Sequence, residues 1–134
     1  MQRVIPMMAY EDAAAAMDWL VHTFGFTERD RLTENGVVGH GELELDGGTV
    51  YLAQPTPDYE GPRRHAQTCE AARRWQEVPW VIDGVFVQVN DVDAHYERAK
   101  TAGATILSEP EDTPHGRQYR VEDLEGHRWM FAQA

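Results

Sequence analysis

The chain has 134 residues, and its 42% hydrophobic and 26% charged content is ordinary for a globular protein with one core. Asp and Glu outnumber Lys and Arg by 23 to 12, and the net charge of −11 argues against a nucleic-acid partner, because phosphates attract basic residues. The same charge suits a neutral or cationic small molecule, and it also suits plain solubility.

The first half of the chain predicts a strand, a helix and further strands. Residues 4–10 are apolar and short, which is typical of a buried strand. Asp12 follows as a helix N-cap, and Gly25 marks the helix end. The buried face of this helix is predicted to carry Ala13, Met17, Leu20, Val21 and Phe24. Residues 37–45 and 50–53 then predict two strands joined by the turn Asp46-Gly47-Gly48.

Alternation along these strands separates two faces. Leu43, Leu45, Val50 and Leu52 form an apolar face that a helix must cover. The opposite face is predicted to carry His40, Glu42, Glu44 and Tyr51. Such a face is too polar for a core, and it predicts one wall of a small-molecule cleft.

Residues 55–83 form a long connector that Pro57, Pro62 and Pro79 interrupt, with a short helix predicted over 65–76. It contains three aromatic residues, Tyr59, Trp75 and Trp80. One interpretation is that the connector covers a pocket or bridges subunits. The other is that the two tryptophans anchor the connector to the body of the protein.

The second half repeats the pattern of the first. A strand is predicted over 85–89, with Phe86 and Gln88 facing away from the helix. Asp91 caps a helix that stops at Gly103 and buries Val92, Tyr96, Ala99 and Ala102. A turn at 123–126 precedes the last strand, in which Trp129 and Phe131 point one way and Met130 the other.

The two halves correspond at nearly constant spacing. Asp12 and Asp91 are 79 residues apart, Gly25 and Gly103 are 78 apart, and Gln54 and Gln133 are 79 apart. This repeat predicts an α+β fold in which two βαβββ modules form curved mixed sheets around a cleft, with the helices on the outer face. We expect a single domain over 1–134, consisting of a module at 1–54, the connector at 55–83 and a module at 84–134.

The paired modules, the segment from Val89 to His95, the helix stop at 102–104 and the ending from Asp123 to Trp129 resemble the vicinal oxygen chelate superfamily. That superfamily includes glyoxalase I, extradiol dioxygenases and bleomycin-resistance proteins. The resemblance covers the chain outside 55–83. It also implies a homodimer, with modules either side by side or exchanged between subunits. Fold alone does not determine function.

The resemblance further implies where a family metal would bind: Ile5 and Gly84 in the first strands, and Tyr51 and Met130 in the last strands of the modules. Neither Ile5, Gly84 nor Met130 offers an oxygen or nitrogen ligand, and a neutral tyrosine is an unusual one. We therefore expect no metal cofactor at these positions. His40 and Glu42 share one strand face, where they form either a hydrogen-bonded pair or part of a relocated metal or general-base site. The remaining histidines are predicted to be structural or on the surface: His22, His65, His95, His115 and His127.

The leading hypothesis is metal-independent binding of a small, planar aromatic natural product, either neutral or cationic, as in antibiotic sequestration, self-resistance or a carrier role. The predicted ligand-binding residues are Met7, His40, Glu42, Glu44, Tyr51, Tyr59, Trp75, Trp80, Phe86, Gln88 and Met130. The first alternative is a glyoxalase-like lyase or isomerase, or a dioxygenase, that uses a relocated metal or a general base at His40 and Glu42. The second is a structural or regulatory dimer.

The number of cysteines bears on disulfide bonding, and the pattern of apolar residues bears on cellular location. Cys69 is the single cysteine, so an internal disulfide and a thiolate cluster are excluded. The sequence shows no signal-peptide pattern and no long apolar run, which predicts a cytoplasmic protein with no membrane partner.

Overall fold

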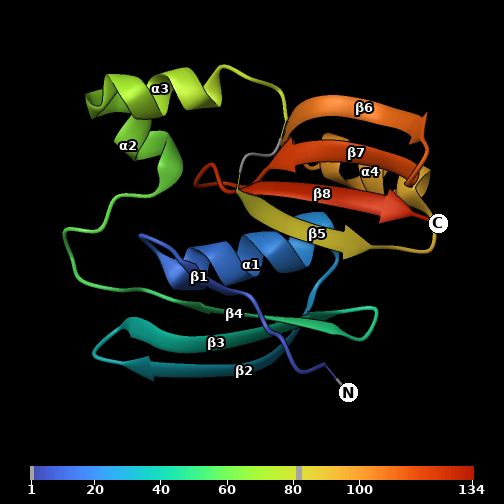
Figure 1. The fold of residues 1–134 in the computed structure, drawn as a ribbon. Helices are drawn as coiled ribbons and strands as arrows, with labels where there is room; N and C mark the ends of the chain where they lie inside the picture. The colour runs from blue at the N-terminus through green and yellow to red at the C-terminus, as the bar shows by residue number, and fades with distance from the viewer. Residues whose placement is uncertain (1, 81–82) are drawn as a thin grey trace. The chain divides into compact units, whose positions relative to one another are not determined.

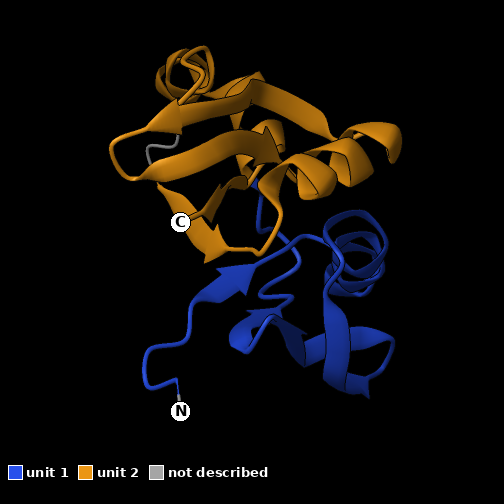
Figure 2. Cartoon of the chain, turned by 90° about the vertical axis from the view of Figure 1, so that its right-hand side faces the viewer, with its two compact units in different colours: residues 1–61 blue, residues 62–134 orange. Residues whose placement is uncertain are grey.

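A computed structural model describes residues 2–80 and 83–134 of the chain. The chain divides into two compact units, Met1–Gly61 and Pro62–Ala134 (Figure 2). Each unit contains a four-stranded mixed sheet with a helix on one face (Figure 1). This arrangement confirms the predicted α+β class and the βαβββ modules. Positions 81 and 82 of the predicted connector lie outside the described residues.

The first unit has the strand order β1-β4-β3-β2, in which β1 is parallel to β4 and the other pairs are antiparallel. Its elements are β1 (Met7–Ala9), α1 (Ala13–Phe24), β2 (Thr27–Glu34), β3 (Val37–Leu45) and β4 (Gly48–Ala53). The prediction of a strand over 4–10 was wrong at both ends, because only residues 7–9 pair with β4. Val4 is 83% exposed rather than buried.

Helix α1 begins and ends where the sequence predicts. The Asp12 carboxylate accepts a hydrogen bond from the backbone N–H of Ala15 at 3.0 Å, and Gly25 closes the helix in the left-handed conformation at φ 85°. The helix lies close to the sheet at Gly41 of β3. A Cβ atom there would lie 2.6 Å from Met17 Sδ, so the missing side chain permits this close approach.

The second unit adds two short helices before its sheet. Its elements are α2 (Pro62–Thr68), α3 (Glu70–Gln76), β5 (Gly84–Gln88), α4 (Val92–Thr101), β6 (Thr105–Thr113), β7 (Gly116–Glu122) and β8 (Arg128–Gln133). The single helix predicted over 65–76 was wrong, because Cys69 has an extended backbone and separates α2 from α3. The strand order is β5-β8-β7-β6, with β5 parallel to β8.

Three aromatic residues of the second sheet lie in its core. Trp129, Tyr119 and Phe131 are fully buried, and the rings of Trp129 and Phe131 stack at 6.1 Å. Asp91 caps α4 by accepting from the N–H of Ala94 at 3.0 Å. Of the helices that the structure describes, none has the length and apolar character needed to cross a membrane.

Candidate functional site

The face of the first sheet opposite α1 carries a row of side chains that crosses all four strands. Cross-strand pairing joins Met7 to Tyr51, Tyr51 to Glu42, and Glu42 to Asp30. Residues paired in this way place their side chains on the same face of a sheet. The row changes from a thioether and an aromatic ring on β1 and β4 to two carboxylates on β3 and β2.

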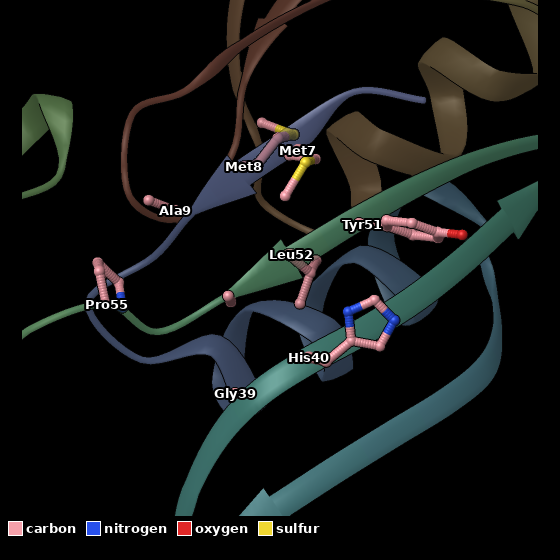
Figure 3. Close-up of a pocket in the computed structure, with 9 residues that line it drawn as sticks. Met7, Met8, Ala9, Gly39, His40, Tyr51, Leu52 and Pro55 are labelled. Atoms are coloured by element: carbon pink, nitrogen blue, oxygen red, sulfur yellow. The ribbon is translucent and has the colours of Figure 1, made fainter. Parts of the chain in front are cut away.

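A hollow of about 230 Å³ lies on this face, over β1, β4 and β3 (Figure 3). Met7 and Met8 from β1, Tyr51 from β4 and His40 from β3 are among the residues that line it. The His40 ring packs edge to face against Tyr51, with 4.8 Å between ring centroids. Met7 is 82% exposed, so a large apolar side chain beside the hollow is available for contact.

His40 also marks the acidic part of the face. Its Nε2 lies 2.9 Å from Glu42 Oε1, and the two side chains are 36% and 30% exposed. Asp30, His40 and Glu42 each offer one ligand atom, and these three atoms all lie within 4.8 Å of one another. This trio offers the oxygen and imidazole ligands of a divalent cation, or a hydrogen-bonded acidic wall for a cationic group. A second, wider hollow extends from His40 over Leu32 and Val37.

Glu44, the second acidic residue predicted on this face, is already paired. Glu44 Oε2 accepts a hydrogen bond from Arg29 Nε at 2.6 Å. Its charge is therefore partly neutralised by a neighbour on β2. Glu42 instead contacts His40, and Asp30 accepts a hydrogen bond from the backbone N–H of Arg31 at 2.9 Å. We infer that Glu42 and Asp30 supply most of the negative charge on this face.

The aromatic residues of the connector have two different environments. Tyr59 donates from its hydroxyl to the carbonyl oxygen of Ala9 at 3.2 Å, which attaches the connector to the end of β1. Trp75 is 62% exposed and Trp80 is 53% exposed. The interpretation that these two tryptophans anchor the connector was therefore wrong, since an anchoring ring is mostly buried.

Two arginines attach the connector to the second sheet instead. Arg128 on β8 donates to the carbonyl oxygens of Val78, Trp80 and Gln76, the last at 2.8 Å, and also to Glu122 Oε2 at 3.0 Å. Arg63 at the start of α2 donates to the other carboxylate oxygen, Glu122 Oε1, at 3.2 Å. Neither arginine was predicted to have this role, because the sequence does not distinguish such an arginine from one on the surface.

The second sheet also has an open face, opposite α4. Here cross-strand pairing joins Phe86 to Met130, Met130 to Arg120, and Arg120 to Ser108. Phe86 is 54% exposed, and Gln88 lies exposed two residues along the same strand. Of the predicted site residues, Phe86, Gln88 and Met130 therefore share this second face. Met7, His40, Glu42, Glu44 and Tyr51 share the first.

The positions of the family metal do not form a metal site in this chain. Gly84 has no side chain, Ile5 is aliphatic, and Met130 offers only a thioether beside Phe86. Tyr51 offers only a hydroxyl group, and its ring already packs on His40. A hard or borderline divalent cation requires carboxylate, imidazole or thiolate ligands, so these four residues do not fit it.

Comparisons with known proteins agree with this architecture. TioX from Micromonospora sp. ML1 is 35% identical in its crystal structure, which aligns with 99% of this chain and 96% of its own at a TM-score of 0.73. TnmS3, an antibiotic binding protein from Streptomyces sp. CB03234, shares the fold at 18% identity and a TM-score of 0.66, over 98% of this chain and 96% of its own.

A curated relative of unassigned function from Mycobacterium tuberculosis is 33% identical over 96% of this chain and 72% of its own length. The sequence profile of one family matches residues 5–131. The chain belongs to the Glyoxalase/Bleomycin resistance protein/Dioxygenase superfamily.

Proposed function

We propose that the protein binds a small, planar aromatic molecule on the open face of its first sheet, without a metal, and thereby sequesters or carries it. The observation that carries the proposal is the hollow beside Met7, Tyr51 and His40, where a thioether and two aromatic rings lie together. Thioethers and aromatic edges make favourable contacts with a flat ring. Glu42 and Asp30 lie beside this wall and favour a guest with a positive charge or hydrogen-bond donors.

A structural relative supports the proposal that the protein binds a small molecule. TnmS3 is described as an antibiotic binding protein, and this chain shares its fold. Sequestration requires only affinity and enough protein, so it is compatible with family metal positions that have lost their ligands. We infer that the protein acts as a homodimer in the cytoplasm.

The test uses 9-aminoacridine, which is planar and cationic at neutral pH, and neutral acridine as its matched control. Binding is followed by NMR of 13C-methyl-labelled methionine, because Met7 and Met8 report on the first sheet and Met130 on the second. We expect saturable shifts of Met7 and Met8 and tighter binding of the cation. Shifts confined to Met130, or none at saturating probe, would contradict the proposal.

Variants then identify the contacts. Tyr51→Ala should weaken 9-aminoacridine by roughly 1–3 kcal/mol, because it removes the ring at the centre of the row. Trp75→Ala and Trp80→Ala should weaken it by a similar amount if either exposed ring stacks on the guest, and unchanged affinity in both would exclude them from the site. Phe86→Ala is the matched control, since Phe86 is an exposed aromatic residue on β5 in the second unit.

The alternative is an enzyme that uses a divalent cation at Asp30, His40 and Glu42, which the proximity of their ligand atoms favours. The two functions differ in their response to metal. A metal-free binder keeps its affinity for 9-aminoacridine after treatment with EDTA, and Zn²⁺ or Ni²⁺ does not raise its melting temperature. A stoichiometric metal removed by His40→Ala would favour the enzyme.

A further inference from the structure

The guanidinium of Arg120 has donor groups that the protein does not use. Arginine has five N–H donors. Among the described residues, its Nη1 lies 3.5 Å from Ser108 Oγ and forms a long ion pair with Glu111 Oε1 at 3.9 Å, and its Nε is buried with no hydrogen-bond partner. Arg128, on the neighbouring strand, is by contrast bonded to a carboxylate and three carbonyl oxygens. The Arg120 guanidinium therefore keeps N–H donors that a ligand can use.

Its surroundings on the open face of the second sheet are apolar on one side. Arg120 pairs across the sheet with Met130, and Met130 pairs with Phe86, which is 54% exposed. The side chain of Arg120 is 22% exposed, so its guanidinium is held near the sheet rather than extended into solvent. A partly desolvated guanidinium binds a carboxylate more strongly than a fully hydrated one does.

The internal repeat gives an independent reason to regard this row as a recognition surface. Phe86 and Met130 lie 79 residues after Met7 and Tyr51, and Arg120 lies 78 residues after Glu42. The second row therefore occupies the positions of the row that borders the hollow of the first sheet. At the equivalent position the charge is reversed, from a carboxylate to a guanidinium.

We propose that the open face of the second sheet binds an aromatic carboxylate, whose ring lies on Phe86 and Met130 and whose carboxylate is bound by Arg120. An acceptor with two oxygens matches the planar fork of a guanidinium, and the adjacent thioether and ring accept a flat apolar group. Phe86, Met130 and Arg120 all belong to the second unit.

The probes are 2-naphthoate and its neutral isostere 2-naphthamide, followed through the methionine methyl signals of the full chain. We expect 2-naphthoate to shift Met130 saturably and 2-naphthamide to bind at least tenfold more weakly. Arg120→Gln should weaken 2-naphthoate by about 10- to 100-fold. Arg120→Lys should weaken it less, since a lysine keeps the charge but loses the fork.

Arg117→Gln is the matched control. It removes the same charge from the same strand, but Arg117 points to the other face, where it pairs with Asp93 on α4 at 3.0 Å. Unchanged affinity in Arg120→Gln, equal affinity for the amide, or shifts of Met7 and Met8 instead of Met130 would overturn the inference. If acetate binds as tightly as 2-naphthoate and displaces it, the proposed role of the aromatic ring would be overturned. Failure here leaves 9-aminoacridine binding to the first sheet untouched, so the two proposals fail separately.

Discussion

Replacing Arg128 with methionine should destabilise the second unit by detaching the connector. The Arg128 and Glu122 side chains are 7% and 9% exposed, so their ion pair is buried. Removing one partner of a buried pair costs about 3–5 kcal/mol, because the remaining charge is left uncompensated. Arg63 still lies 3.2 Å from the other oxygen of Glu122 and offsets part of that cost. We therefore expect a loss near the lower end, about 3 kcal/mol.

The measurement is urea unfolding followed by circular dichroism, with trypsin digestion as a second readout. Connector cleavage after Arg73 and Arg74 should accelerate in the variant, because the carbonyls of Gln76, Val78 and Trp80 lose their common donor. Arg63→Met is the comparison: its side chain is 43% exposed, so its loss should cost less. A loss below about 1 kcal/mol for Arg128→Met, or an equal loss for both variants, would refute this account of the attachment.

Two further predictions concern the cores of the modules. Gly41→Ala should cost about 1–3 kcal/mol in urea unfolding, because its Cβ would overlap the buried Met17 side chain, and an unchanged midpoint would mean that α1 shifts without penalty. Burial raises the pKa of the Tyr119 hydroxyl in the folded state, whereas in the unfolded chain the pKa is about 10. Above about pH 10 the unfolded state therefore loses this proton while the folded state keeps it, so the free energy of unfolding falls as the pH rises further. Melting temperatures measured up to pH 11 should therefore fall less steeply for Tyr119→Phe than for the original chain, and parallel profiles would contradict the assignment.

The framework of the fold could be predicted because local signals determine it. Asp12 and Asp91 cap their helices by the same hydrogen bond, to an N–H three residues later. The turn at Asp46 and Gly47 has positive φ at both residues, as an Asp-Gly hairpin turn requires. Alternation also predicted that Trp129 and Phe131 share one face of β8, and both are fully buried. Each of these features depends on residues that are close in sequence.

The candidate sites were only partly predictable because they depend on pairing between strands. Asp30 was missed, since the segment 27–34 has no apolar alternation and its register against Glu42 is not visible in the sequence. Arg120 was missed for the same reason, because its neighbours Met130 and Ser108 come from two other strands. The exposure of Trp75 and Trp80 was likewise hidden, because it depends on how Arg128 holds the connector.

The repeat separates the part of each module that maintains the fold from the part that is free to vary. Gln54, directly after β4, accepts a hydrogen bond from the N–H of Ala13, and Gln133 at the end of β8 accepts one from the N–H of Val92. In both modules the end of the last strand is therefore bonded to the first turn of the helix. These contacts lie on the covered side of each sheet and are the same in both modules. On the open sides, Glu42 and Arg120 differ in charge at equivalent positions although the backbone pairing around them matches. Because a change there disturbs neither the caps nor the core, the open faces can acquire different ligand preferences within one fold.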